Sequence, residues 1–384
     1  MTTGCLVANI SGGDISNINV KCEINSLAIE REAGGLIGYL NNEYDTNISN
    51  ITISGVITAM QSTVGGLIGR VVGAHTTKLN IQNVVIEGKA TSPTKLKGSI
   101  VGGVIGLYKV LTTNRTSILN TLIKDNTTID AAIGGGFIGH VDAYASDDNE
   151  RTANLDLKVD KIKSAATLTS NRSSSYATLA GIIGKVSFRS LHENKIEISN
   201  AILSSKFEET TADSNYSIAS LIYAIGDYYN NTNPIDIKIS NIISKSQLSS
   251  NGNSHLSTVG NLHDTNITIE NSVFIDNMRN TSDPIVTGIT YKHVYFYEKM
   301  GSGVTDDVNS TTYRAFSFNN SKTPSAILAT AGGSTKSLTK ELNDNVKKYN
   351  KDKLTNATEW LLWKVGTHKL DGKKVNLPLV NINE

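Results

Sequence analysis

Apolar and polar residues alternate in short stretches along most of this chain. In Ile196-Glu-Ile-Ser-Asn200, two aliphatic residues flank one polar residue and are followed two positions later by asparagine. A period of two places successive side chains on opposite faces of a β-strand and excludes a helix. Eight stretches follow this pattern, at residues 18–22, 51–55, 79–83, 116–120, 157–161, 196–200, 237–241 and 267–271.

A second apolar string, typified by Gly34-Gly-Leu-Ile-Gly38, recurs between these stretches. It returns at residues 65–69, 102–106, 135–139 and 180–184, and weakens afterwards. A further apolar pair or triplet, such as Val84-Val-Ile86, follows most of the alternating stretches. Each unit therefore predicts about three short strands separated by corners.

These units predict an all-β fold, a right-handed parallel β-helix (β-solenoid) of about eight rungs that occupies residues 1–295. The spacing between units is uneven, which a solenoid accommodates by insertions in its corner loops. A leucine-rich repeat is the nearest alternative, but its asparagine comes three residues after the second apolar position. Nothing between the strands of this chain has the pattern of a helix.

Like residues stack on like residues in such a coil, because successive rungs lie about 4.8 Å apart. Inward-facing Ile and Val then form aliphatic columns, and asparagines at a corner form an amide ladder along the axis. Glycine pairs permit corners with positive φ or a close approach between backbones. The predicted corner positions are Asn83, Asn120, Asn200, Asn241, Asn271, Gly35, Gly66, Gly103, Gly136 and Gly181.

Residues 296–384 lack the repeat and predict a small α+β capping segment. Leu338, Leu342, Val346 and Tyr349 are spaced by four, four and three residues, which predicts one amphipathic helix with Ser337 or Thr339 as its N-cap. A hairpin is expected over residues 370–375. Because a solenoid exposes an apolar cross-section and unpaired strand edges at its ends, we expect the helix and both tryptophans to cover the end of the coil.

Composition and charge narrow the possible partners. There are 36 basic and 35 acidic residues, so no strong field attracts nucleic acid. No apolar run is long enough to span a bilayer, so membrane insertion is not expected. The two cysteines, Cys5 and Cys22, either form one bridge between neighbouring strands or remain buried thiols. The first residues lack a signal-peptide pattern and already read as part of a repeat, so we expect a fragment of a longer precursor.

The Gly-Gly-Leu-Ile-Gly string, followed by the alternating residues 47–58, resembles the GLUG-type repeat of bacterial surface proteins. Similar repeats occur in the non-catalytic region of IgA1-protease-like zinc metallopeptidases. The resemblance covers residues 4 to 290, although the glycine pair is lost in the last three rungs. It implies a module of a large secreted or surface-anchored protein, outside the cell.

No assembled catalytic motif is present, and we expect no enzyme activity, no cofactor and no bound metal. The zinc-peptidase pattern His-Glu-x-x-His is absent, because His192-Glu lacks the second histidine. Asp147, Asp148 and Glu150 form a weak candidate for a glycan or ion loop. The expected function is adhesion to a host or matrix protein or glycan, or rigid spacing. The alternatives are a scaffold for a secreted zinc peptidase and a polysaccharide-cleaving or glycan-binding β-helix.

Overall fold

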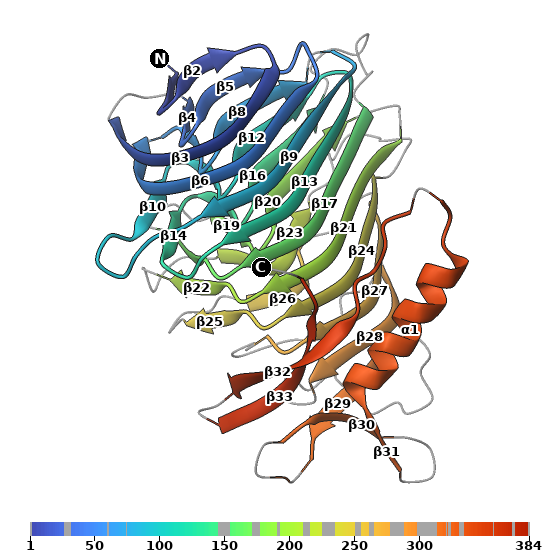
Figure 1. Ribbon diagram of the computed structural model, residues 1–384. Helices are drawn as coiled ribbons and strands as arrows, with labels where there is room; N and C mark the ends of the chain where they lie inside the picture. The colour runs from blue at the N-terminus through green and yellow to red at the C-terminus, as the bar shows by residue number, and fades with distance from the viewer. Residues whose placement is uncertain are drawn as a thin grey trace.

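The computed structural model is a parallel β-solenoid with one helix and one hairpin attached to its side (Figure 1). It describes residues 2–26, 32–59, 61–73, 75–144, 154–170, 177–189, 193–209, 216–224, 235–249, 255–260, 265–276, 288–297, 313–319, 321, 324–329, 334–355, 357–370 and 373–382. The predicted all-β solenoid class is therefore confirmed.

The coil has three faces. The first, the long face, contains β3 (Gly13–Ser26), β6 (Thr46–Ala59), β9 (Thr77–Ile86), β13 (Thr113–Ile123), β17 (Asn154–Ser164), β21 (Asn194–Leu203), β24 (Ile235–Ser244), β27 (Thr265–Phe274), β28 (Ile289–Tyr297) and β29 (Tyr313–Phe318). The second, the short face, contains β10 (Thr94–Lys97), β14 (Thr127–Asp130), β18 (Thr167–Ser170), β22 (Lys206–Glu209) and β25 (Gln247–Ser249). Every neighbouring pair of strands in these two faces is parallel.

The glycine strings build the third face, in which most turns contribute two strands separated by a bend. The strands before the bend are β1 (Thr3–Gly4), β4 (Glu32–Gly34), β7 (Thr63–Gly65), β11 (Ile100–Gly102), β15 (Ile133–Gly135) and β19 (Ala177–Ala180). Those after it are β2 (Val7–Ile10), β5 (Ile37–Asn41), β8 (Ile68–Gly73), β12 (Ile105–Val110), β16 (Ile138–Tyr144) and β20 (Ile183–Arg189). In later turns, β23 (Tyr216–Ala224) and β26 (His255–Val259) complete this face.

About five turns, rather than the expected eight, have all three faces as separate strands. At the N-terminal end, β3 and β6 run unbroken through the corner between the long and short faces. After β26, the described residues continue only the long face. Counting the alternating stretches therefore overestimates the number of complete turns. The same apolar spacing also occurs at both ends of the coil, where a turn lacks one or two of the three separate strands.

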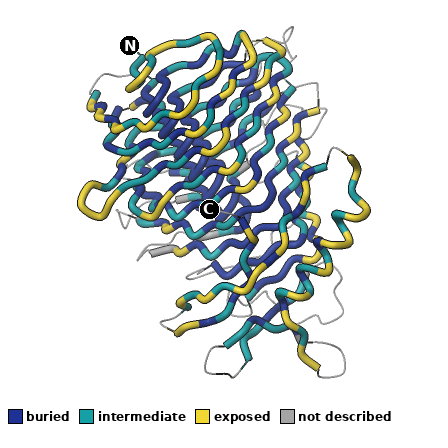
Figure 2. The backbone as a smooth tube through the Cα atoms, viewed as in Figure 1, coloured by how far each residue is buried: buried dark blue, intermediate teal, exposed yellow. Residues whose placement is uncertain are grey.

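Apolar side chains fill the inside of the coil in columns. Figure 2 marks the buried residues along the backbone in dark blue. One column runs along the long face through residues that the strand register places opposite one another, and each is at most 2% exposed. Burial of each such side chain contributes about 1.5–3 kcal/mol. The column contains Ile48, Ile81, Ile118, Val159, Ile198, Ile239 and Ile269.

The second glycine of each string lies where adjacent backbones nearly touch. A Cβ atom on Gly103 would lie 2.1 Å from the carbonyl oxygen of Gly136, and Gly35, Gly66, Gly136 and Gly181 have equivalent contacts with the next turn. None of these five glycines has a positive φ. Glycine is therefore required by the close approach of neighbouring backbones, and not by left-handed geometry. The row ends at Ser220, where the strand register shifts between Ala219 and Ile222. This shift accompanies the loss of glycine in the last turns.

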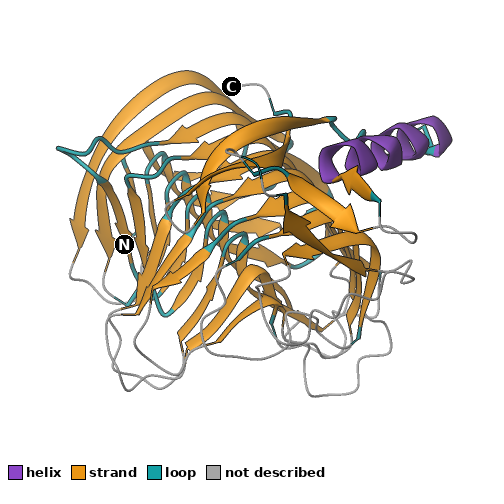
Figure 3. Ribbon diagram, turned by 90° about the horizontal axis from the view of Figure 1, so that it is seen from below, coloured by secondary structure: helices purple, strands orange, loops and turns teal. Residues whose placement is uncertain are grey.

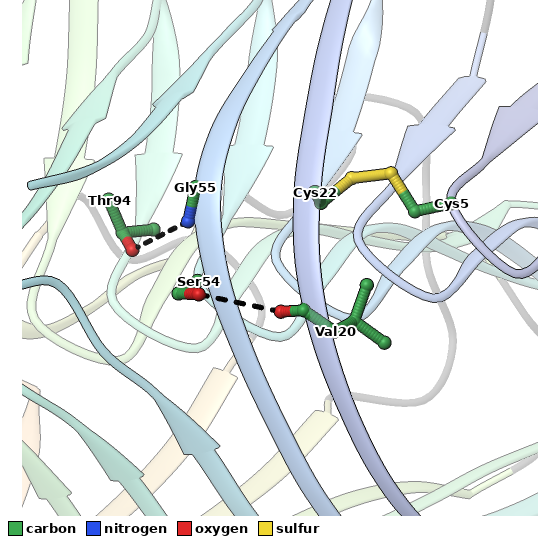
Figure 4. The surroundings of a disulfide bond; sticks show 6 residues. All are labelled: Cys5, Val20, Cys22, Ser54, Gly55 and Thr94. Atoms are coloured by element: carbon green, nitrogen blue, oxygen red, sulfur yellow. Dashed lines mark hydrogen bonds between the residues drawn. A yellow bond between two sulfur atoms is a disulfide. The ribbon is translucent and has the colours of Figure 1, made fainter. Parts of the chain in front are cut away.

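One disulfide, Cys5–Cys22, closes a 17-residue separation at the N-terminal end (Figure 4). Cys22 lies on β3 and is fully buried, whereas Cys5 lies in the bend between β1 and β2. The bridge therefore joins the long face to the third face across the first turn. The alternative of two buried thiols is wrong.

The C-terminal segment begins with a small antiparallel extension of β29, formed by β30 (Ala326–Ala329) and β31 (Thr335–Ser337). The predicted helix follows as α1 (Leu338–Asp352), with Ser337 at its N-cap but without a side-chain capping bond. The hairpin is longer than expected and consists of β32 (Trp363–Leu370) and β33 (Lys373–Val380). Because β29 stacks on β28, solenoid pairing also continues past residue 295.

The helix and hairpin lie against the outside of the coil and not across its open end. Figure 3 shows α1 outside the ring of strands. A second apolar cluster forms there from Ile243, Val273 and Tyr295 of the long face, Leu342 of α1 and Trp363 of β32, with their neighbours. The expectation that these elements cover the cross-section is therefore wrong. The apolar residues of the helix and the hairpin instead pack against an outward-facing apolar row on β24, β27 and β28.

Candidate functional site: an asparagine ladder and its open groove

A row of residues with left-handed backbone geometry marks one corner of the long face. Their φ angles lie between 44° and 59°. Asparagine is the residue besides glycine that adopts this geometry most readily, since its short amide bonds locally. All five predicted asparagines lie in this row, here called the ladder. In order along the coil, its members are Asn17, Asn50, Asn83, Asn120, Lys161, Asn200, Asn241, Asn271 and His293.

The ladder amides bind one another along the axis of the coil. Asn120 donates from Nδ2 to Oδ1 of Asn83 at 2.8 Å, and Asn83 donates to Asn50 at 2.9 Å. In the later turns, Asn241 donates to Asn200 at 2.7 Å, and Asn271 donates to Asn241 at 2.9 Å. An amide with an asparagine on both sides, such as Asn83 or Asn241, thereby uses one N–H and one oxygen lone pair along the axis, and has one of each left for a group beside the ladder.

Lys161 divides the ladder into two halves. It adopts the same left-handed geometry but has no amide. Asn200 therefore donates to Oδ1 of Asp160, at 2.7 Å. We name Asn17 to Asn120 the upper half and Asn200 to Asn271 the lower half.

The sequence analysis matched residues 18–22 and 51–55 to the other alternating stretches. It therefore placed Cys22 and Gly55 at the ladder positions that Asn17 and Asn50 occupy in the structure. The register pairs Ile51 with Val84, not with Leu79. Residues 46–50 are thus the equivalents of 79–83. The alignment was wrong because apolar residues occur on both sides of each ladder position, so two registers satisfy the alternation equally.

The chain's own C-terminal segment covers the lower half of the ladder. Asn200 donates to the carbonyl oxygen of Glu359 at 2.9 Å and accepts from the backbone N–H of Leu361 at 2.8 Å. Asn241 then donates to the carbonyl oxygen of Leu361 at 2.9 Å and accepts from the indole Nε1 of Trp363 at 2.6 Å. The two amides therefore bind the main chain at residues 359 and 361 and the Trp363 indole, advancing two residues for each rung.

Further contacts fix this segment and the helix beside it. Asn345 on α1 donates to Oδ1 of Asn271 at 3.2 Å, which continues the ladder onto the helix. Thr358 donates to Glu197 at 2.7 Å. Burial favours a raised pKa for Glu197, but the bonds from Thr358 and Lys195 outweigh it and lower the pKa, so the carboxylate stays charged.

An outward-facing row runs parallel to the ladder, two residues further along each strand. Its register order is Val85, Leu122, Lys163, Ile202, Ile243, Val273 and Tyr295. Ile243 and Val273 are fully buried under the C-terminal segment. Val85 and Leu122 remain partly exposed.

A groove of about 620 Å³ lies over the uncovered part of this row. Asn83 and Asn120 lie on one side, and Val85, Leu122 and Lys163 of the outer row form its floor. Lys161 lies between the groove and the lower half. A smaller hollow of about 430 Å³ connects it to the docked segment, since Leu361 and Ile382 line that hollow together with Asn83, Asn120 and Lys161. The groove thus continues the surface that the C-terminal segment occupies.

The other predicted site residues do not contribute to this groove. The five glycines lie in the third face, where they serve backbone packing. Asp147, Asp148 and Glu150 lie outside the described residues. Within the described ranges, no group of three His, Cys, Asp or Glu side chains is placed to hold a metal ion. No helix in the described part of the chain is long and apolar enough to cross a membrane.

Sequence reasoning missed the docking role of the lower ladder and the groove above it. One signal was present: Ile202, Ile243 and Val273 stand at positions where an outward-facing strand residue is normally polar. An apolar row on a solvent-facing side indicates a covered surface.

Comparisons with known proteins give no assignment. No family model matches the chain, and neither the curated proteins nor the solved structures include a match. The resemblance to GLUG-type repeats stays a prediction.

Proposed function

We propose that this chain is a non-catalytic binding module of a secreted or cell-surface protein, a rigid coil that holds a partner in the groove over β9, β13 and β17. The observation that carries the proposal is the divided outer row. Its lower part is buried under the chain's own C-terminal segment, and its upper part, at Val85 and Leu122, is an open groove.

The rigidity of the coil supports this role. Asn83, Val85, Asn120 and Leu122 lie on strands paired on both sides in continuous register, so their backbone positions are fixed before a partner arrives. A surface that is ordered in advance loses less entropy on binding than a loop surface. Asn83 and Asn120 supply polar groups, and Val85 and Leu122 supply apolar area, which together make a surface suited to a specific partner.

Binding to a panel of purified extracellular-matrix proteins and a glycan array tests the proposal. Leu122→Arg places a charge on the groove floor and should weaken binding of the recognised partner at least about tenfold. The matched control is Leu107→Arg on β12, where the neighbouring turn already has Arg70 in register. The absence of any bound partner, or equal binding by the Leu122→Arg variant, would overturn the proposal.

A further inference from the structure

The open half of the ladder has the same free hydrogen-bonding groups as the occupied half. In the occupied half, the off-axis N–H and oxygen of Asn200 and Asn241 bind the main chain of residues 359–361 and the Trp363 indole. Asn83 bonds along the axis in the same way, and Asn120 donates to Asn83, while its own oxygen faces the Lys161 rung. Within the described structure, no protein group meets their off-axis N–H, and both side chains are exposed.

From this equivalence we infer that Asn83 and Asn120 bind the backbone of an extended peptide segment from a partner protein, in the manner in which Asn200 and Asn241 bind residues 359–363. The inference rests on the proposed function and names its ligand class. The peptide runs from the Asn83 rung towards the Lys161 rung, because the chain's own segment runs from Asn200 to Asn241.

The groove also defines the side chains of that peptide. Apolar residues pack on Val85 and Leu122, as the C-terminal segment packs on Ile243 and Val273. At the C-terminal end of the peptide, an acidic residue faces Lys161, which is exposed and has no ion-pair partner in the described ranges. A peptide, unlike a glycan, offers alternating N–H and C=O groups at the two-residue advance that this ladder already accepts.

The test uses a fluorescein-labelled, C-terminally amidated peptide, Thr-Leu-Trp-Leu-Leu-Glu, which keeps the apolar run of residues 360–362 and has the Glu carboxylate as the charge at its C-terminal end. Fluorescence anisotropy measures its binding to the full chain. Asn120→Gly should weaken binding about fivefold, since it removes the amide while glycine retains the left-handed backbone. The matched control is Asn17→Gly, which has the same backbone geometry outside the groove and should bind normally.

A charge exchange tests the direction of the peptide. Lys161→Glu should weaken binding of the acidic peptide about tenfold and should bind the same peptide ending in Lys better than the wild type does. Circular dichroism checks that each variant is folded.

Two outcomes separate the failure of this inference from that of the proposed function. In the first outcome, Leu122→Arg weakens binding of a panel member, but the wild-type chain does not bind the peptide. The groove is then a binding site for another ligand class, such as a glycan, and the inference is wrong. The inference is also overturned if Asn120→Gly and Asn17→Gly change the affinity for the peptide by the same factor. If nothing on the panel and neither peptide binds, both proposals fail.

Discussion

The indole Nε1 of Trp363 donates a 2.6 Å hydrogen bond to the side-chain oxygen of Asn241. These residues are 122 positions apart, and both are buried, Trp363 at 4% and Asn241 at 0% exposure. The bond joins the C-terminal hairpin to the corner ladder of the coil. The same oxygen accepts from Asn271 along the ladder, so the indole supplies its second donor and helps to select the position at which the hairpin docks.

Trp363→Phe should lower the free energy of unfolding by about 0.5–1.5 kcal/mol beyond the loss caused by the smaller ring, because the Asn241 oxygen loses one of its two donors and keeps the bond from Asn271. Urea unfolding followed by circular dichroism measures the change. Trp360→Phe is the matched control, since the Trp360 ring stacks on Tyr349 at 3.7 Å and its indole N–H makes no bond within the described structure. Equal losses in the two variants would show that the indole bond is unimportant.

Gly103→Ala should prevent normal stacking of two turns. The added methyl group would lie 2.1 Å from the carbonyl oxygen of Gly136, and the parallel pairing on both sides leaves the backbone no room to move. We expect a loss of at least about 3 kcal/mol, measured by urea unfolding. A loss below about 1 kcal/mol would contradict the close-approach explanation for the glycine row.

Reduction of the Cys5–Cys22 bridge, or the double substitution Cys5→Ser with Cys22→Ser, should destabilise the first turns by about 3 kcal/mol. The loss arises because the bridge limits the freedom of the unfolded N-terminal segment. Hydrogen exchange should show faster opening in β1, β2 and β3, with little change in β21 and β24. A uniform increase along the whole coil would contradict this local role.

Asp276 should make stability depend on pH. It is 2% exposed and accepts bonds from Ser220, Ser244 and the backbone N–H of Ser246. Burial raises its pKa to about 6, and the three bonds oppose part of that rise. The folded state then holds the proton more tightly than the unfolded state. The stabilisation is present below about pH 4 and is lost as pH rises through about 6, at a cost of about 3 kcal/mol.

Urea unfolding between pH 4 and pH 7 measures this effect as the difference between wild type and Asp276→Asn. The difference is needed because burial lowers the pKa of His140 to about 3 and of His368 to about 4. Both histidines therefore add stability as pH rises, against the trend of Asp276. Parallel pH profiles for the two proteins would show that Asp276 is not the titrating group.

The ladder was predictable from sequence because its geometry is local. Asparagine adopts left-handed geometry at low cost, and its spacing after the second aliphatic residue identified Asn83, Asn120, Asn200, Asn241 and Asn271. Asn17 and Asn50 were not identified, since the alternation around them allows two registers. Only the pairing of Ile51 with Val84 across neighbouring strands selects one of them.

The sequence by itself determined the all-β solenoid, the aliphatic columns, the helix and the hairpin, because these follow from residue periodicity and turn preference over a few positions. The tertiary structure alone decided that the C-terminal segment lies on the side of the coil, covers Asn200 and Asn241, and leaves Asn83 and Asn120 beside an open groove. That choice depends on contacts between residues more than 100 positions apart, such as Asn241 with Trp363. No local pattern encodes which rungs the segment meets.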